Sequence, residues 1–388
     1  MNAATRLPAL LVAAALTATL AGAAPRTLTA SGVHLVSETR IDTSGDGAMQ
    51  YRVPALAITA RGVLVACYDA RNVSVADLPN NIDIVCRRSF DGGETWAERQ
   101  VVARHAESDV PELAFGVGDP NLTYDRDTGR LFLFHIGAPP GVGFAGALPS
   151  DRPDDRTTLH PWYRFSDDDG ATWSDTVDLT AQLKEPGMGG IIASAGKGTQ
   201  LADGTLVVPY LYRRDGSNVG AFAVSADHGR TWRMTEPLPG TMVDEHKVEQ
   251  LADGSLISNA RPGVGAGPYR RTATAPGIDG PWTVPVARLG LPDPGCNGDI
   301  LRVDPDPDGP RADWLLASNP ASQTDRTHLV VRLSKDGGAS WPEEYAVETG
   351  PSGYSTMVAL PDGSFAVLFE HTVPDSLKFV RFGLDRFE

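Results

Sequence analysis

The sequence of 388 residues contains only three cysteines, Cys67, Cys86 and Cys296, and no C-x-x-C motif. Three cysteines cannot all pair with one another, so a scaffold built on disulfides is excluded. Cys67 and Cys86 lie in two segments that have the pattern of neighbouring strands. They either form one disulfide or pack as small apolar side chains, and the sequence leaves both possibilities open.

Motifs for several common kinds of chemistry are also missing. The eight histidines include no H-E-x-x-H motif and no spacing typical of metal ligands. There is no G-x-S-x-G turn for a serine nucleophile and no glycine-rich loop that could bind phosphate. The sequence therefore predicts neither a metal site nor a nucleotide site.

Positive charge is scarce. The 34 lysines and arginines are outnumbered by 49 acidic residues, which gives a formal net charge of −15. This balance argues against nucleic acid and against an anionic membrane surface as partners. If the ligand is itself an anion, a local cluster of cations must oppose the field of the protein.

A long apolar run occurs only near the N-terminus. Arg6 precedes the apolar segment Leu7 to Leu20, which is followed by the small residues Ala21 to Ala24. This order is typical of a secretory signal peptide, and the run is shorter than the roughly 20 residues that span a bilayer. We therefore expect residues 1–24 to be a leader and the protein to be secreted, periplasmic or extracellular, without membrane insertion.

The rest of the chain has little helical periodicity. Short runs alternate apolar with polar residues and are separated by Gly, Pro, Asp and Asn, as at 63–68, 131–135 and 206–210. This pattern is typical of strands and turns. No linker divides the chain, so we expect a single all-β domain over residues 31–388.

One octapeptide pattern, S-x-D-x-G-x-[ST]-W, occurs four times, at residues 89–96, 166–173, 225–232 and 334–341. A degenerate fifth copy ends at Trp282. The Asp and the hydroxyl groups can bond nearby backbone N–H groups, the Gly accepts positive φ, and the Trp covers the turn. The chain is therefore built from repeats.

A second recurring signal has the same order of spacing. Turns containing glycine precede strand-like runs at Gly62, Gly129, Gly204, Gly254, Gly309 and Gly363. Successive turns are about 50 to 75 residues apart, near the period of a four-stranded propeller blade. The sequence thus predicts a six-bladed β-propeller of four-stranded antiparallel sheets, in which loops from distant segments meet on one face.

The segment Tyr51-Arg-Val-Pro-Ala-Leu56 places an arginine in the first of these strands. Together with the repeated turns, it resembles the bacterial exo-α-sialidases, or neuraminidases, whose hallmarks are an Arg-Ile-Pro motif and several "Asp boxes". Val53 replaces the usual Ile. The resemblance covers nearly the whole chain after the leader. It implies retaining hydrolysis of terminal α-linked sialic acids on glycoconjugates, without a metal or an organic cofactor.

The resemblance implies three arginines that bind the substrate carboxylate, at the positions of Arg52, Arg261 and Arg326. A guanidinium group presents a fixed fork that can meet a carboxylate with two hydrogen bonds. Such charge-assisted bonds contribute about 1.5–3 kcal/mol each, enough to hold an anionic sugar on an acidic protein. Glu370 matches the family acid that supports the first arginine.

The resemblance further implies that Tyr354, in Gly353-Tyr-Ser-Thr356, is the nucleophile and that Glu245 removes its proton. A phenol suits this substrate because the anomeric carbon of a sialic acid already bears a carboxylate, which repels an anionic Asp or Glu. With a pKa near 10, the phenol costs about 4 kcal/mol to deprotonate at pH 7, so it needs a base. Asp244 is the alternative to Glu245.

For the acid/base that protonates the leaving oxygen, Asp77 matches the family position, with Asp69 and Asp83 as nearby alternatives. Such an acid must be held protonated near the working pH by burial or by a neighbouring charge. Substrate contacts are implied for Arg71 and Asp119, near the C4 and N-acyl substituents, and for Asn297, near the glycerol side chain. We also expect Phe115 and Trp162 to form apolar walls.

Three alternatives stay open at this stage. The same scaffold could transfer the sugar instead of hydrolysing it, or it could act on a related nonulosonic acid without an N-acetyl group. It could also be a binding propeller without activity, although a phenol paired with a base argues for catalysis. The oligomeric state is not determined by the sequence, and a monomer is compatible with it.

Overall fold

The computed structural model describes residues 33–105, 115–240, 242–372 and 375–384. The predicted leader, residues 1–24, lies outside the described residues. Within them, α1 (Thr180–Leu183) is the only helix, and nearly everything else is strand and turn. No described helix has the length and apolar character needed to cross a bilayer. The prediction of an all-β chain is confirmed.

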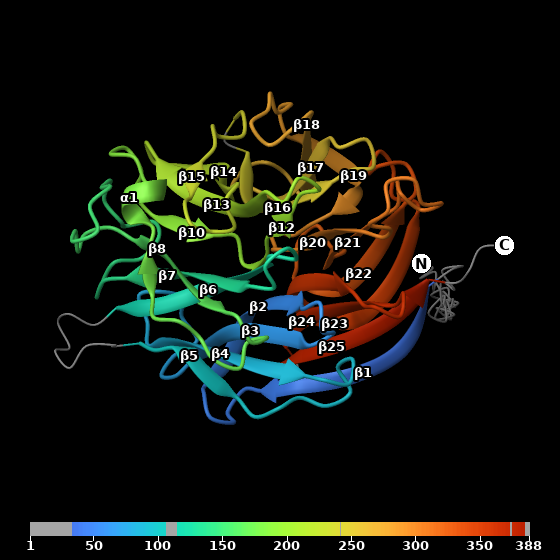
Figure 1. Cartoon of the computed structure of the whole chain (residues 1–388), viewed down its shortest axis with the longest axis horizontal. Helices are drawn as coiled ribbons and strands as arrows, with labels where there is room; N and C mark the ends of the chain where they lie inside the picture. Colours follow the sequence, from blue (N-terminus) through green and yellow to red (C-terminus); the bar gives the residue numbers. More distant parts are fainter. Residues whose placement is uncertain (1–32, 106–114, 241, 373–374, 385–388) are drawn as a thin grey trace, which may run out of the picture.

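The strands form five hydrogen-bonded sheets (Figure 1). The first contains β2 (Gln50–Ile58), β3 (Leu64–Arg71), β4 (Ile82–Ser89) and β5 (Gln100–Ala103). The second contains β11 (Gly196–Lys197), β6 (Gly116–Tyr124), β7 (Leu131–Ala138), β8 (His160–Ser166) and β9 (Val177–Asp178). The third contains β10 (Ile191–Ala193), β13 (Leu206–Arg214), β14 (Ser217–Ser225) and β15 (Arg233–Met234), with β12 (Thr199–Gln200) also paired to β13.

The fourth sheet contains β16 (Val243–Gln250), β17 (Leu256–Pro262), β18 (Tyr269–Ala275) and β19 (Val286–Pro292). The fifth has seven strands: β1 (Val33–Thr43), β25 (Asp375–Leu384), β24 (Phe365–Thr372), β23 (Glu343–Ala359), β22 (Thr327–Ser334), β21 (Leu315–Pro320) and β20 (Asp299–Arg302). The long β23 pairs with β22 in its first half and with β24 in its second. It therefore joins two four-stranded parts into one sheet.

The sheets follow one another around the molecule in chain order, so that the first and last parts of the chain lie side by side (Figure 1). Their first strands contact one another: β2 contacts β6 and β23, β16 contacts β13 and β20, and β20 contacts β23. At the ends of the described chain, β1 pairs with β25. Residues on the first strands of distant sheets are therefore brought close together.

The four repeated turns share one hydrogen-bonding pattern. In the first, Ser89 Oγ accepts the N–H of Gly93 at 2.9 Å and Asp91 Oδ1 accepts the N–H of Thr95 at 2.9 Å. The same pair of bonds recurs in the turns that begin at Ser166, Ser225 and Ser334. The role of these motifs as closed turns is confirmed.

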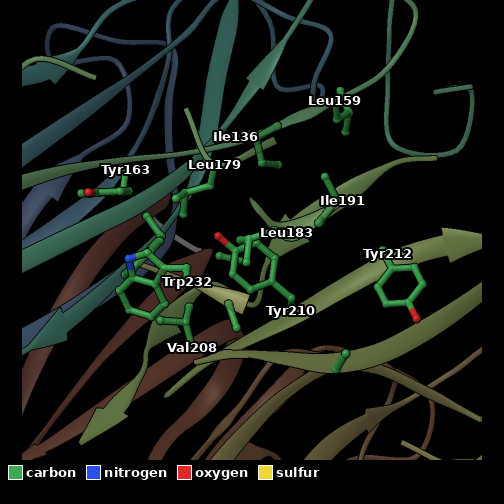
Figure 2. Close-up of a cluster of buried hydrophobic side chains, with 14 of the residues drawn as sticks. Ile136, Leu159, Tyr163, Leu179, Leu183, Ile191, Val208, Tyr210, Tyr212 and Trp232 are labelled. Atoms are coloured by element: carbon green, nitrogen blue, oxygen red, sulfur yellow. The ribbon is translucent and has the colours of Figure 1, made fainter. Parts of the chain in front are cut away.

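The largest apolar core lies between the second and third sheets and α1. Figure 2 shows aromatic and branched side chains meeting there, among them Ile136 of β7, Tyr210 of β13, and Leu159 and Trp232 from the connections before β8 and β15. All four are at most 5% exposed. Ile136 and Leu159 are also part of the cavity described below, so this core fixes one wall of the site.

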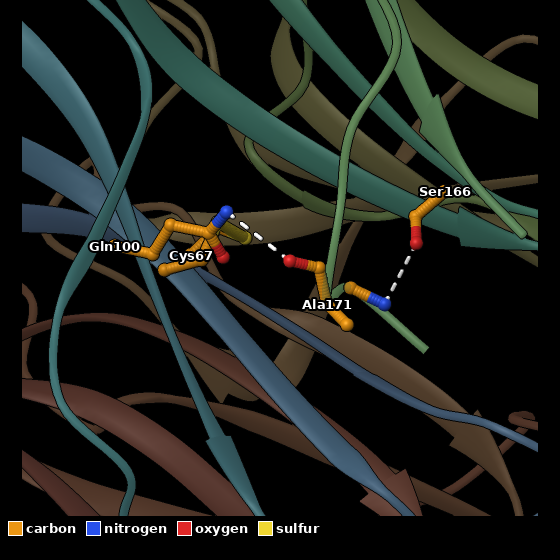
Figure 3. The surroundings of a disulfide bond; sticks show 6 residues. Cys67, Gln100, Ser166 and Ala171 are labelled. Carbon is orange, nitrogen blue, oxygen red and sulfur yellow. Dashed lines mark hydrogen bonds between the residues drawn. A yellow bond between two sulfur atoms is a disulfide. The ribbon is translucent and has the colours of Figure 1, made fainter. Parts of the chain in front are cut away.

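The open question about the cysteines is answered by a disulfide between Cys67 and Cys86 (Figure 3). The two residues face each other in the register of β3 and β4. Beside them, Gln100 Nε2 donates to Ala171 O at 3.3 Å, which links the first sheet to the turn of the second. Cys296 is buried and is not part of a disulfide.

We expect the double variant Cys67→Ala/Cys86→Ala to lose about 3 kcal/mol of unfolding free energy, because a cross-link over this loop restricts the unfolded chain. Denaturant unfolding of the oxidised wild type and the variant measures the difference. Cys296→Ala is the matched control for removing buried sulfur without removing a cross-link. Equal midpoints for the double variant and this control would show that the disulfide does not stabilise the fold.

Candidate active site

A cavity of about 340 Å³ opens where the first strands of several sheets meet. It is lined by residues that are far apart in the sequence: Arg52, Val53, Arg71, Asp77, Leu78, Asp119, Ile136, Phe144, Leu159, Ile192, Leu211, Arg213, Asn218, Asp244, Glu245, Arg261, Arg326 and Tyr354. All three predicted carboxylate-binding arginines are in this set. The predicted nucleophile and its base are there as well.

Tyr354 on β23 and Glu245 on β16 are in direct contact. The phenol Oη donates to Glu245 Oε2 at 2.5 Å, and Arg261 Nη1 donates to both of these oxygens at 2.9 Å. Glu245 is 3% exposed. Asp244, the alternative base, instead accepts the N–H of Glu245 at 2.8 Å and the amide of Asn218 at 3.0 Å. The geometry therefore favours Glu245 as the proton acceptor.

The electrostatics of this pair are set by burial and by the cations beside it. Burial raises the pKa of Tyr354 well above its usual value, and the negative charge of Glu245 raises it further. Arg261 and Arg326 act in the opposite direction. The phenol is consequently protonated at neutral pH, and its proton is already hydrogen-bonded to the carboxylate that can accept it.

Glu370 on β24 joins the first arginine to the nucleophile. Its Oε1 accepts Arg52 Nε at 2.6 Å and the N–H of Val53 at 2.8 Å, while Oε2 accepts the N–H of Tyr354 at 3.0 Å. Burial raises the pKa of this carboxyl, but the charge and hydrogen bond of Arg52, together with the N–H groups of Val53 and Tyr354, outweigh it, so the net pKa is lowered. Glu370 is thus ionised and only 1% exposed, and its hydrogen bonds hold both Arg52 and Tyr354 in place.

Arg326, in the loop before β22, is the third arginine of the group. Its Nη2 donates to Gly295 O at 3.1 Å, and its guanidinium carbon lies 5.3 Å from the centre of the Tyr354 ring. Arg52, Arg261 and Arg326 thus come from three different sheet regions and all line the same cavity.

Two residues of the cavity have a strained backbone. Val53 and Asp119 have φ values of 56° and 54°, and both precede a proline at an irregularity in strand pairing. Positive φ is rare for any residue other than glycine, and for a β-branched residue such as valine it is an outlier. Strain of this kind costs about 1–3 kcal/mol and concentrates at functional sites.

Asp77 lines the cavity, but its environment differs from the one expected for a buried acid. Its side chain is 86% exposed and is hydrogen-bonded to the guanidinium of Arg71. Arg71, in contrast, is 2% exposed and also donates to Val75 O at 2.6 Å. Of the two conditions expected for the acid, Asp77 does not meet burial, because the loop that carries it lies at the surface, and the charge beside it is that of Arg71.

The alternative acids lie elsewhere. Asp69 is buried, accepts the N–H of Asp119 at 3.1 Å, and has its pKa raised by burial to about 7. Asp83 accepts the amide of Asn72 and the N–H of His105. Neither of these aspartates is among the residues that line the cavity, whereas Asp77 and Asp119 are.

Three predicted substrate contacts are not brought to the cavity. Asn297 is 1% exposed, accepts Lys247 Nζ at 2.9 Å and donates to Ala195 O at 2.9 Å, so both ends of its amide are used inside the protein. Phe115 and Trp162 pack against each other with ring centres 4.9 Å apart, outside the cavity lining. None of these three residues lines the cavity in this structure.

Sequence reasoning missed the apolar wall of the cavity, which is formed by Leu78, Ile136, Phe144, Leu159, Ile192 and Leu211. Phe144 and Leu159 belong to the long connection between β7 and β8, and its length was the available signal, since long ordered loops are often functional. Arg213 and Asn218, from the β13–β14 hairpin, were also missed. Arg213 donates to Asn218 Oδ1 at 3.1 Å.

Comparison with known proteins identifies the class. A family model described as a BNR repeat-like domain matches residues 62–367, so the chain belongs to this family of repeat-built β proteins. Within it, the chain is a member of the sialidase family, since it is 30% identical to an exo-α-sialidase of Aspergillus fumigatus over 84% of this chain and 80% of the relative. It is 38% identical to a sialidase of Micromonospora viridifaciens, over 93% of this chain and 57% of the relative. A sialidase of Bacteroides fragilis is 29% identical over 84% of this chain and 61% of the relative.

Solved structures agree with this assignment. A Hadza microbial sialidase superposes with a TM-score of 0.78 at 29% identity, over 87% of this chain and 66% of that chain. A leech intramolecular trans-sialidase superposes with a TM-score of 0.74 at 20% identity, over 90% of this chain and 70% of that chain, which supports the fold alone. The chain spans a little over half the length of the two sialidase sequences above.

Proposed function

We propose that the protein is an exo-α-sialidase that hydrolyses terminal α-linked sialic acids with retention, through a covalent intermediate on Tyr354. The observation that carries the proposal is the direct contact of Tyr354 with Glu245, both bonded to Arg261 inside a cavity that Arg52 and Arg326 also line. The three guanidinium groups suit a sugar that carries a carboxylate, and the phenol in contact with a buried base suits attack on that sugar.

The arginines would bind the substrate carboxylate. The protein has a net charge of −15, so an anionic ligand is attracted only where cations are concentrated. Arg52 is held by Glu370 and Arg326 by Gly295 O, which leaves their remaining N–H groups available in the cavity. Positions fixed in advance reduce the entropy that substrate binding must overcome.

In the first chemical step, Tyr354 Oη attacks the anomeric carbon while its proton passes to Glu245. The bond from that carbon to the leaving oxygen breaks, and Asp77 supplies the proton that the leaving oxygen takes up. In the second step, Asp77 removes a proton from water, the water oxygen attacks the same carbon, and the tyrosyl bond breaks with return of the proton from Glu245. Two inversions give net retention.

We also propose that the chain is a six-bladed β-propeller, in which residues 31–388 form one catalytic domain and residues 1–24 direct export. The seven-stranded sheet supports this count. The strand β23 changes partners near Ser352, so the sheet consists of two four-stranded parts that share β23, and each part would be a separate blade. Pairing of β1 with β25 would then complete the last blade and close the ring.

The apolar wall favours an N-acylated sugar over its deaminated relative. Leu78, Phe144 and Ile192 offer apolar surface that a methyl group can cover, whereas a hydroxyl group there would lose its hydrogen bonds to water. Sialylated glycans are therefore the proposed substrates. Hydrolysis releases the free sugar, whereas transfer within the substrate would give an anhydro sugar.

Proton NMR of 3′-sialyllactose cleavage tests the proposal in one experiment. We expect free sialic acid that appears first as the α-anomer and then mutarotates. A β-anomer as first product would contradict the tyrosyl mechanism, an anhydro sugar would indicate transfer, and binding without turnover would indicate a non-catalytic propeller.

For Asp77→Asn we expect a loss of activity whose size depends on the leaving group of the substrate. Cleavage of sialyllactose should fall by about 10²–10⁴-fold, the range contributed by general acid catalysis. Cleavage of a 4-nitrophenyl sialoside should fall much less, because that leaving group needs little protonation. Steady-state kcat/KM on both substrates measures this, with Asp83→Asn as the matched control. Equal losses on both substrates would show that Asp77 is not the acid.

A further inference from the structure

The apolar wall of the cavity has a buried cation behind it. Lys184 immediately follows α1 and is only 5% exposed. Its Nζ donates to Leu159 O at 3.0 Å and to Gly189 O at 2.9 Å, and it also donates to Thr158 Oγ1. The side chain of Leu159 lines the cavity. One of the three hydrogen bonds therefore ends on the backbone of a residue that forms the wall.

The acceptors of these hydrogen bonds belong to the two segments that carry the wall. The connection between β7 and β8 brings Phe144 and Leu159 to the cavity, and β10, with the segment before it, brings Ile192. The backbones of the two segments approach closely, since a Cβ on Gly190 would lie 2.2 Å from Phe144 O. Lys184 donates to a carbonyl oxygen of each segment. The three wall side chains are therefore linked through one ammonium group.

The surroundings of Lys184 show that stability alone does not explain its charge. All three groups that accept its hydrogen bonds are neutral, and a buried ammonium group in such a setting is costly. Burial lowers the pKa of Lys184 to about 8, while the charges of Asp155, Asp151 and Asp178 act in the opposite direction. Burial lowers the pKa of His160, and the charge of Lys184 lowers it further. What the lysine supplies is three hydrogen-bond donors at one point.

We propose that Lys184 is a positioning residue that fixes the apolar wall and thereby sets the preference of the site for N-acylated over deaminated sugars. The inference rests on the proposed function, which assigns the N-acyl group to this wall. Lys184 does not line the cavity, so it acts through Leu159 and the connection that carries it. A gap of about 0.5–1 Å between a wall and a methyl group forfeits roughly a quarter to a half of their dispersion attraction.

The test compares kcat/KM for two 4-nitrophenyl glycosides, one of the N-acetylated sugar and one of the deaminated sugar. Lys184→Met removes the three donors and keeps an unbranched side chain. We expect kcat/KM for the N-acetylated sugar to fall roughly tenfold, the lower end of what one carbon contributes in a hydrophobic pocket. The value for the deaminated sugar should change little, because that sugar has no acyl group for the wall to contact.

In the wild type, the ratio of the two kcat/KM values should also depend on pH. The protonated amine of Lys184 has three hydrogens to donate, one more than the neutral amine. With a pKa of about 8, the protonated form predominates at pH 7 and is lost toward pH 9, so the ratio should fall over this range. Groups that titrate in the chemical steps affect both sugars alike and cancel in the ratio. In Lys184→Met the ratio should not change between pH 7 and 9.

Two further variants separate this effect from a general loss of structure. Thr158→Val removes one acceptor of Lys184 and a hydrogen bond to Gly189 O at 3.3 Å. It should lower the ratio by less than Lys184→Met does, and it covers the case that Lys184→Met does not fold. Lys378→Met is the matched control, because Lys378 lies on β25 and is paired with Glu38 and Glu348 at 2.9 and 3.2 Å. It should lower the melting temperature without changing the ratio.

A ratio that keeps its wild-type value in folded Lys184→Met and Thr158→Val proteins overturns the inference. So does an equal fall in Lys378→Met, or a wild-type ratio that is constant from pH 7 to 9. A wild-type protein that cleaves both sugars equally well overturns the inference and leaves sialidase activity intact. A wild-type protein that turns over neither sugar overturns the proposed function, and this inference with it.

Discussion

Replacement of Tyr354 by Phe should reduce turnover by roughly 10³-fold or more, the scale seen when a nucleophile is removed from an enzyme that otherwise keeps its site. The variant loses only the phenolic oxygen. The N–H of residue 354 still bonds Glu370, and Arg261 still bonds Glu245, so the site keeps its shape. We therefore expect the loss in kcat, with KM for a 4-nitrophenyl sialoside changed only slightly.

Tyr345→Phe is the matched control for this experiment. Tyr345 lies on the same strand, β23, where its ring stacks on Phe382 with centres 6.4 Å apart, away from the cavity. Both variants should unfold within about 1 kcal/mol of wild type, as judged by denaturant titration. Wild-type turnover in folded Tyr354→Phe protein would show that another group is the nucleophile.

The repeats in the sequence predicted most of the architecture because each repeated turn is local. Ser89, Asp91 and Gly93 lie within one turn, so their hydrogen bonds depend on neighbours in the chain. The extent of a sheet is not local. The Gly-Pro-Ser-Gly segment at residues 350–353 coincides with the point at which β23 changes partners from β22 to β24, but no local pattern indicates that both halves belong to one continuous strand.

For the site, a motif predicted which residues to consider but not how each side chain is oriented. Tyr354, Glu245 and Arg261 all line the cavity and are bonded together. Asn297 lies only a few residues from Gly295, which holds Arg326, yet its amide is turned inward to Lys247. That direction depends on the register of β20 against its neighbours, which no local pattern specifies.

The apolar wall of the cavity shows a second limit of prediction from the sequence. Phe144 and Leu159 come from an irregular connection without any period, and their positions depend on packing against the third sheet. A Cβ on Gly190, for example, would lie 2.2 Å from Phe144 O, so the connection can pass there only because residue 190 is glycine. Such close approaches are decided by tertiary contacts, which no local pattern in the sequence specifies.

Arg261→Met is expected to be the most damaging change among the three arginines. Arg261 donates to Tyr354 Oη and to Glu245 Oε2, each at 2.9 Å, in addition to its proposed contact with the substrate carboxylate. Two or three charge-assisted bonds at about 1.5–3 kcal/mol each sum to about 3–9 kcal/mol, which corresponds to a loss of roughly 10²–10⁷-fold in kcat/KM. Because two of the bonds involve the nucleophile and its base, kcat should fall as well as the affinity for substrate.

Arg326→Met provides the contrast, because Arg326 hydrogen-bonds to Gly295 O and only approaches the ring face of Tyr354. Its loss should appear mainly in KM. Arg261→Lys should recover part of the activity, since it restores the charge without the fork that reaches two oxygens. If Arg261→Met raised KM and left kcat unchanged, Arg261 would act on the substrate alone, and the phenolate that forms during attack would have to be stabilised by Arg326.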